Sequence, residues 1–280
     1  MGEFLYGTSS WSASSWDGVF YPKGMAPGDY LAFYAGVFQT VEADVTYYRI
    51  PSRQMVEGWN RKTPDGFVLC AKFPRTIVHA GEERLPDGDL LLKRDKIGSD
   101  VDRFLEAMSF LGPKCGPLVL QFPYFNKKVF DGPEPFLERL DAFLEALPSA
   151  FRYAVELRNR TWLKPALMEI LRRHRTALVL VDLKYMPHPD SLVDEIDLVT
   201  TDFSYVRLIG DRKAVEERTK TFDRIVMNQT PRLIRWAGLL KDLLPRSERT
   251  LVFANNHFAG HGPATIGELA TLVEGASHAG

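Results

Sequence analysis

The sequence has few cysteines, almost no net charge and no long apolar run, and each of these features excludes a class of protein. Cys70 and Cys115 are the only cysteines in 280 residues, so there is neither a disulfide framework nor a CxxC pair, which favours a cytoplasmic protein. The 35 basic and 36 acidic residues leave a formal charge of −1, which gives no global signal for nucleic acid or membrane surfaces. No stretch approaches the ~18 apolar residues of a membrane span, and the N-terminal residues lack the pattern of a signal peptide.

Motifs for several common chemistries are also absent. The nucleophile motif GxSxG, the phosphate loop GxxxxGK[ST] and the zinc motifs HExxH and HxxEH do not occur. His79, His257 and His261 are scattered and do not have the spacing of a metal site. We therefore expect a protein without a bound metal or cofactor.

The sequence does contain eight short apolar runs rich in Val, Leu and Phe, separated by amphipathic stretches. The runs cover residues 4–8, 38–45, 67–72, 118–122, 153–158, 177–182, 205–209 and 251–255. The amphipathic stretches cover residues 28–36, 52–61, 101–111, 135–147, 164–174, 230–244 and 263–273. Continuous apolar runs are typical of strands buried on both faces of a parallel sheet, and strand–helix alternation predicts right-handed βαβ units.

Eight strands in 280 residues predict an α/β protein built as a single (β/α)8 barrel of the TIM type over residues 1–280. A doubly wound open sheet is the alternative. It normally carries a glycine-rich loop after its first strand, where this chain has Thr8-Ser9-Ser10-Trp11. Two long charged stretches, 81–100 and 211–223, are expected in loops at the carboxyl end of the barrel, and residues 275–280 are expected to form a frayed tail.

Polar residues stand at or near the carboxyl end of nearly every predicted strand. In a barrel, side chains at these ends point into the mouth, where active sites are built. A charge in an otherwise apolar strand costs desolvation free energy, so the pattern indicates a functional site. The residues are Glu42, Lys72, Gln121, Glu156, Arg158, Asp182, Arg207, Asn255 and Asn256. The alternative interpretation is a ring of structural ion pairs that holds the top of the barrel together.

The charges in this set balance, which argues against both a cationic phosphate sink and an acidic metal site. The candidate catalytic groups are Glu42, Glu156 and Asp182. The candidate residues for binding an anionic or oxygen-rich substrate are Lys72, Gln121, Arg158 and Arg207. Glu42 and Glu156 are the acid–base candidates, and a glycosidase is one version of this hypothesis. Retaining glycosidases need carboxyl groups ~5 Å apart, and inverting ones ~6.5–9.5 Å apart.

Aromatic residues cluster in the loops that follow four of the predicted strands. They are Trp11, Trp16, Tyr47, Tyr48, Tyr124, Phe125 and Trp162. Flat rings in a cleft stack on nucleobases or sugar faces, whereas the alternative is a small core within the loops. The rings that we expect to contact the substrate are Trp11, Trp16, Tyr47, Tyr48 and Trp162.

The segment that follows the last predicted strand is a further candidate for substrate binding. It precedes a helix that we expect to begin near Pro263, and this junction is a common phosphate site in barrels. We expect Asn255, Asn256 and His257 to contact the substrate, with His257 also a candidate for acid–base chemistry. His261 is expected in a surface loop.

In order along the chain, these motifs resemble the YecE-like family of barrels (domain of unknown function 72). The resemblance rests on Gly7-Thr8-Ser9-Ser10-Trp11, Trp16-Asp17-Gly18-Val19-Phe20-Tyr21-Pro22, Phe38-Gln39-Thr40-Val41-Glu42, Thr46-Tyr47-Tyr48-Arg49-Ile50-Pro51, Gln121-Phe122-Pro123, Ala154-Val155-Glu156-Leu157-Arg158-Asn159 and Asn255-Asn256-His257. It implies a TIM-barrel fold and no settled activity. One departure is Ala43-Asp44, where relatives tend to have an aliphatic residue and asparagine, and it adds a negative charge beside Glu42. Barrel enzymes of similar fold, such as endonuclease IV and xylose isomerase, rely on metal-binding histidines at a density that this chain lacks.

Three functions fit these features. The first is an enzyme, a hydrolase or lyase, that acts on a small polar or phosphorylated molecule without a metal. The second is a protein that binds or processes nucleic acid, supported by the aromatic loops and by the excess of basic over acidic residues between Arg207 and Arg249. The third is a non-catalytic barrel that binds a ligand.

Overall fold

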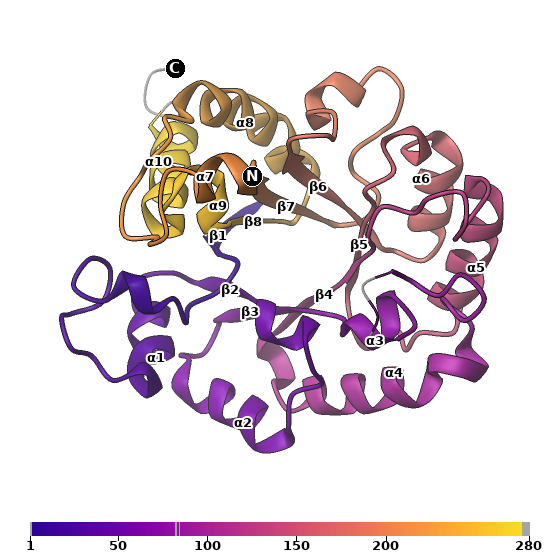
Figure 1. Ribbon diagram of the computed structural model, residues 1–280, viewed down its shortest axis with the longest axis horizontal. Helices are drawn as coiled ribbons and strands as arrows, with labels where there is room; N and C mark the ends of the chain where they lie inside the picture. Colours follow the sequence, from indigo (N-terminus) through magenta and orange to yellow (C-terminus); the bar gives the residue numbers. More distant parts are fainter. Residues whose placement is uncertain (1, 82, 84, 276–280) are drawn as a thin grey trace.

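The chain forms a barrel of eight parallel strands, described by a computed structural model for residues 2–81, 83 and 85–275 (Figure 1). The strands are β1 (Glu3–Thr8), β2 (Thr40–Ala43), β3 (Val68–Lys72), β4 (Cys115–Gln121), β5 (Tyr153–Glu156), β6 (Ala177–Leu183), β7 (Phe203–Gly210) and β8 (Arg249–Ala254). Their order in the sheet is β1-β8-β7-β6-β5-β4-β3-β2. The α/β barrel predicted from the alternating pattern is therefore confirmed.

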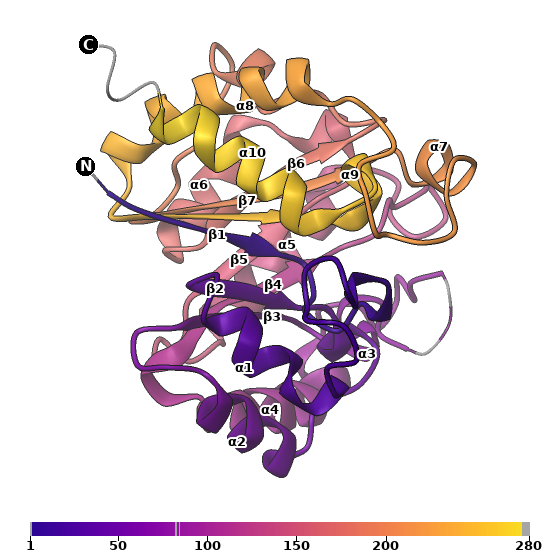
Figure 2. The same cartoon turned by 90° about the vertical axis from the view of Figure 1, so that its left-hand side faces the viewer.

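Helices surround this ring of strands (Figure 1). They are α1 (Tyr30–Ala35), α2 (Arg53–Lys62), α3 (Arg75–Val78), α4 (Arg94–Ser109), α5 (Pro133–Glu145), α6 (Pro165–Arg173), α7 (Arg212–Glu216), α8 (Thr230–Leu243), α9 (Asn256–Ala259) and α10 (Gly262–Glu274). In the side view the strands point toward the end of the barrel that carries α7, α9 and α3, and we call this end the mouth (Figure 2). No helix in the described part of the chain combines the length and apolar character that a bilayer span requires. The tail expected at 275–280 lies, beyond Gly275, outside the described residues.

Among the elements that differ from the sequence expectation, β2 and α4 do so for identifiable reasons. Strand β2 ends at Ala43 and not at 45, because residues Asp44–Tyr47 turn into the 3-10 helix η3. Thr46 stabilises this turn, since its Oγ1 lies 2.9 Å from the Ala43 carbonyl oxygen and accepts the N–H of Lys72. Helix α4 begins at Arg94, seven residues before the expected 101, because the buried side chain of Ile97 extends its apolar face by a further turn.

The barrel interior is a small apolar core, separate from the larger core between strands and helices. It consists of Leu5, Val68, Cys70, Val119, Ala154, Ala177, Val179, Phe203, Tyr205, Leu251 and Phe253. These residues identify the inward face of each strand, because successive side chains in a strand point to opposite sides. Cys70 is buried, whereas Cys115 begins β4 and is only half-buried.

The junction between β1 and β2 closes the barrel through a side chain and not through a strand ladder. The hydroxyl of Tyr34 accepts the N–H of Thr8 at 2.8 Å and donates to the Thr40 carbonyl at 3.2 Å. Gly7 permits this close approach, since a Cβ atom there would lie 2.1 Å from the Thr40 carbonyl oxygen. The junction fixes the position of Thr8, where β1 enters the mouth.

Candidate functional site

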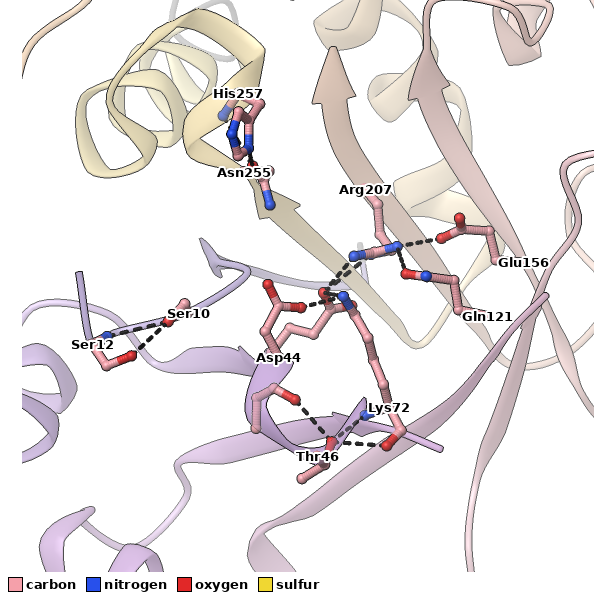
Figure 3. Close-up of polar contacts among 12 residues, drawn as sticks. Ser10, Ser12, Asp44, Thr46, Lys72, Gln121, Glu156, Arg207, Asn255 and His257 are labelled. Atoms are coloured by element: carbon pink, nitrogen blue, oxygen red, sulfur yellow. Dashed lines mark hydrogen bonds and ion pairs between the residues drawn. The ribbon is translucent and has the colours of Figure 1, made fainter. Parts of the chain in front are cut away.

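Five strands contribute a polar side chain to one layer just inside the mouth (Figure 3). The layer consists of Glu42, Lys72, Gln121, Glu156 and Arg207. Each residue lies on the inward face of its strand, as shown by Lys72 and Arg207, which follow the interior residues Cys70 and Tyr205 by two positions. The prediction that these residues meet at the carboxyl ends of the strands is correct in its geometry.

Arg207 lies at the centre of this layer and is 1% exposed. Its guanidinium donates from Nε to Glu42 at 3.1 Å, from Nη1 to Gln121 at 2.7 Å, and from Nη1 also to Glu156. Its Nη2 lies 2.9 Å from the same oxygen of Glu42. One buried cation therefore holds two carboxylates in place, as the planar fork of arginine allows.

Glu42 is fully buried, and both of its carboxylate oxygens have partners. Its Oε1 faces Arg207 and lies 3.4 Å from Lys72 Nζ, while its Oε2 accepts the Tyr205 hydroxyl at 2.8 Å. Burial alone would raise the pKa of Glu42, but Arg207, Lys72 and Tyr205 outweigh it and the pKa lies below its usual value. Glu42 is therefore ionised at neutral pH.

Glu156 has the same character. One of its oxygens accepts from Arg207, and the other accepts from Arg158 Nε at 2.9 Å. Burial would raise its pKa, but Arg207 and Arg158 outweigh this effect and lower the pKa to about 2. The four oxygens of Glu42 and Glu156 are thus all engaged by arginine or tyrosine, an arrangement that leaves no free carboxylate oxygen for the glycosidase version of the enzyme hypothesis.

Asp44 extends the network to the surface and, like Tyr205, is not among the site residues predicted from the sequence. It lies two positions after Glu42, in η3, and its carboxylate pairs with Lys72. The side chain is 31% exposed. Burial of the carboxyl group raises the pKa of Asp44 more than Lys72 lowers it, and the charge of Glu42 adds to the rise. We call Glu42, Asp44, Lys72, Gln121, Glu156, Arg158, Tyr205 and Arg207 the charge network.

Asp44 also lines a recess of about 150 Å³ at the mouth, which we call the mouth recess. Its other lining residues are Thr8, Ser9, Ser10, Trp16, Ala254, Asn255, Asn256 and His257. Ser9 is 2% exposed, and its Oγ has no hydrogen-bond partner among the residues that the structure describes. A buried hydroxyl without a partner is costly, so this group is available to a ligand.

Asn255 and His257 form the wall of the mouth recess on the side of β8 (Figure 3). The Oδ1 atom of Asn255 accepts the backbone N–H of His257 at 2.9 Å and lies 2.8 Å from His257 Nδ1. The amide nitrogen of Asn255 therefore points away from His257, toward the charge network (Figure 3). Burial and Arg212 lower the pKa of His257 despite the nearby Glu216, which favours a neutral ring at pH 7.

A comparison with known families decides the classification. A family model described as "Protein of unknown function DUF72" matches residues 5–279. The chain belongs to the DUF72 family. This confirms the resemblance inferred from the ordered motifs.

One relative of the DUF72 chain is similar in sequence, and two solved DUF72 structures are similar in fold. The UPF0759 protein YecE of Escherichia coli K12 is 38% identical over 129 residues, which make up 46% of this chain and 41% of YecE. A DUF72 protein from Thermotoga maritima is 26% identical with a TM-score of 0.71, and 99% of each chain is covered. A DUF72 protein from Enterococcus faecalis is 21% identical with a TM-score of 0.69 over 96% of this chain and 95% of its own. The chain thus spans about two fifths of the length of the curated relatives that it matches, and nearly the whole length of these solved structures.

Asp182 does not join the charge network of this DUF72 barrel, contrary to expectation. It follows the outward-facing position of Leu180, whereas Val179 of the same strand faces the interior. Its carboxylate pairs with Arg232 and accepts the indole N–H of Trp236 at 2.7 Å, both on helix α8. Because residue parity decides which face of a strand a side chain occupies, Asp182 ties β6 to α8 and is not among the residues that line the mouth recess.

The aromatic residues of the loops fall into two groups. Trp162 and Phe125 are buried and stack at 5.8 Å between ring centroids, so Trp162 belongs to a loop core and is not available to a substrate. Trp16 is also buried, but it lines the mouth recess and donates to Asn256 at 3.3 Å. The remaining rings keep exposed surface: Trp11, Tyr47, Tyr48 and Tyr124.

The histidines of this DUF72 chain have separate positions. His79 lies 3.0 Å from the Tyr47 hydroxyl. His261 was expected in a surface loop, but it is buried. Its Nδ1 accepts the N–H of Ala264 and so caps helix α10. Among the described residues, no group of three or more His, Cys, Asp or Glu side chains is placed to hold a metal ion.

Proposed function

We propose that this DUF72 protein is an enzyme that acts on a small polar or phosphorylated molecule bound in the mouth recess. In this proposal Asp44 exchanges a proton with the substrate and Lys72 faces its negatively charged oxygen. The observation that carries the proposal is the asymmetry of the charge network. Its buried end is saturated with partners, whereas at its other end Asp44, the partner of Lys72, lines the recess.

The buried carboxylates have a positioning role in this proposal. Glu42 and Glu156 are ionised and fully paired, so they hold the cations Arg207 and Lys72 at fixed places. Fixed charges of this kind stabilise charge that develops on a substrate without reorganisation during the reaction. The catalytic role expected for these two residues is thus replaced by an indirect one.

Asp44 has the properties of the acid–base group. Its raised pKa separates it from Glu42 and Glu156, whose pKa values are lowered. Carboxyl groups whose environments push their pKa values apart commonly take different chemical roles. In the protonated form Asp44 would give its proton to a leaving oxygen, and in the ionised form it would take one from water or a substrate hydroxyl.

The charge balance of the network explains why the substrate class includes phosphorylated molecules. Three carboxylates face three cations, so the network is neutral when Asp44 is ionised. Protonation of Asp44 leaves one positive charge in excess beside the recess. The Ser9 hydroxyl and the Asn255 amide are available to donate to the oxygens of an anionic ligand.

A nucleic-acid ligand is the second candidate, and the exposed tyrosines favour it. Tyr48 and Tyr124 are 75% and 63% exposed and follow β2 and β4 at the mouth. Such rings could stack on the bases of a single strand. The balanced charge of the network opposes this function, because binding to a phosphate backbone rests on uncompensated cations.

A cytoplasmic location is part of the first proposal, supported by two cysteines that form no disulfide.

The test compares the wild-type protein with Asp44→Asn in binding and in turnover. Binding of inorganic phosphate is followed by thermal shift, and turnover by a panel of p-nitrophenyl phosphates, esters and glycosides. We expect Asp44→Asn to bind phosphate more tightly, because Lys72 loses one of its two anionic partners. We expect it to lose turnover by about 100-fold or more, the usual contribution of a general acid or base.

Asp65→Asn is the matched control, because it makes the same chemical change at a fully exposed aspartate. It should alter neither measurement. Full turnover in Asp44→Asn would overturn the acid–base role. Phosphate binding without turnover of any probe in the wild type would point to the non-catalytic barrel.

A further inference from the structure

A second recess lies at the opposite end of the barrel from the mouth, and we call it the basal recess. It has a volume of about 550 Å³. The lining residues that matter here are Leu147, Phe151, Arg152, Arg173, Arg175 and Asp202. They stand at the amino ends of the strands, since Arg152 immediately precedes β5 and Asp202 immediately precedes β7. A cavity of this volume matches the range that small-molecule sites occupy.

Three arginines and two carboxylates line the basal recess, namely Arg152, Arg173, Arg175, Glu145 and Asp202. Arg152 Nη1 lies 2.6 Å from Asp202 Oδ1, and Arg175 Nη2 lies 3.8 Å from Asp202 Oδ2, so two guanidinium groups share one carboxylate. Arg173 pairs with Asp141 on the neighbouring helix α5. Arg175 is 82% exposed and keeps most of its N–H groups for another partner.

The backbone at Arg175 has an unusual conformation. Helix α6 ends in a Schellman motif, in which the N–H of Thr176 bonds to the Leu171 carbonyl and that of Arg175 to the Arg172 carbonyl. The residue at this position has a φ of +49°, in the left-handed region where glycine is unstrained and other residues are not. Arg175 thus lines the recess from a strained backbone position, and strained residues cluster at functional sites.

The basal recess also has apolar lining residues. Leu147, Phe151 and the ring of Tyr153 line it, and the Tyr153 hydroxyl already donates to the Pro148 carbonyl at 2.8 Å. A ligand that suits this lining has an anionic group for the arginines and an apolar or planar body for the apolar side chains. Phosphate monoesters combine these parts, and arginine binds phosphate oxygens through paired N–H groups.

We propose that the basal recess is a binding site for an organic phosphate monoester, separate from the mouth recess. The phosphate lies between Arg152, Arg173 and Arg175, and the organic group lies against Leu147 and Phe151. The nearby carboxylates of Asp202 and Glu145 compete with the phosphate for the guanidinium groups. This competition limits the affinity and supplies a test.

The test is isothermal titration of the full chain with phenyl phosphate at low ionic strength, with inorganic phosphate and phenol as separate probes. We expect phenyl phosphate to bind more tightly than either probe. Arg175→Gly should weaken binding by about tenfold or more, because a charge-assisted hydrogen bond is lost. The same substitution relieves the strain at φ +49°, so its melting temperature should equal or exceed that of the wild type.

Asp202→Asn provides a change of the opposite sign, since it removes a competing carboxylate and should tighten binding several-fold. Arg103→Gln removes an exposed arginine on α4 and should leave binding unchanged. Arg173→Gln is measured in parallel and should weaken binding even if Arg175→Gly fails to fold.

The proposal is overturned if phenyl phosphate gives no saturable heat at millimolar concentration. It is also overturned if the Arg175→Gly and Arg173→Gln variants bind as tightly as the wild type, or if Asp202→Asn binds less tightly. In each of those cases the arginines would serve only the ion pairs seen in the structure.

Discussion

The two ends of the charge network use the same kinds of side chain in opposite ways. At the buried end, Glu42 and Glu156 are 0% exposed and have an arginine or tyrosine on every carboxylate oxygen. At the open end, Asp44 is 31% exposed and adjoins a recess that contains an unpartnered hydroxyl. The pKa values of the three carboxyl groups diverge accordingly. Under the proposed function, a ring of ion pairs and a reactive site are not alternatives, because the paired carboxylates hold the cations in place beside Asp44.

The largest loss of stability is expected from removing the cation that Glu42 and Glu156 share at the buried end. Arg207→Met leaves Glu42 and Glu156 buried without their common partner, and we expect it to cost about 3–5 kcal/mol of unfolding free energy. Urea denaturation monitored by circular dichroism measures the loss. The control is Arg158→Met, since Arg158 is more exposed and pairs only with Glu156 within the network. Equal losses in the two variants would contradict a network centred on Arg207.

The unfolding free energy should depend on pH in different ways at the two ends of the charge network. The folded-state pKa of Glu156 is about 2, against a usual value of 4.5, so its ionised form stabilises the fold above about pH 4.5. This stability is lost as the pH falls from 4.5 toward 2, and it amounts to about 3 kcal/mol. Glu156→Gln should flatten this part of the curve of unfolding free energy against pH.

Asp44 should have the opposite sign in the same experiment. Its folded-state pKa is raised, so the folded protein binds its proton more tightly than the unfolded chain does. Its contribution is therefore present at low pH and lost as the pH rises through its folded-state pKa. A stability curve for Asp44→Asn that falls more steeply with rising pH than the wild-type curve would contradict this assignment.

The sequence predicts the barrel well because its evidence is local. Continuous apolar runs separated by amphipathic stretches identify all eight strands, and six of the expected helices begin within two residues of their predicted starts. The exception, α4, begins earlier because Ile97 continues its buried face. Sequence periodicity detects a helix more reliably than it locates its end, where packing decides.

The site was predicted less completely, for two physical reasons. Asp182 stands at a strand end but on the outward face, and parity measured from Val179 would have excluded it. Asp44 was noticed only as a departure from relatives, because strand β2 was expected to continue past it. The turn at η3 depends on Thr46 bonding to Lys72 of another strand, and such a contact cannot be inferred from local sequence.

The smallest effect on stability is expected at the rim of the mouth, where the rings of Tyr48 and Tyr124 are exposed. Tyr48→Ala and Tyr124→Ala should each change the unfolding free energy by no more than about 0.5 kcal/mol, because both rings are largely exposed. Trp162→Ala, within the loop core, is the control and should cost about 3–5 kcal/mol. The double tyrosine variant therefore keeps its fold and serves as a probe of binding at the mouth.

That probe separates the two candidate functions. If the substrate is a small molecule in the mouth recess, a labelled single-stranded oligonucleotide should show no saturable change in fluorescence anisotropy at physiological salt. Arg207 is unsuited to this test, because it is buried and its removal perturbs the fold. Binding that falls steeply with salt and is lost in the double tyrosine variant would instead assign the rim to nucleic acid, since stacking and phosphate contacts would then both be present. The charge network would in that case support a surface for a polymer, and Asp44 would have no substrate proton to exchange.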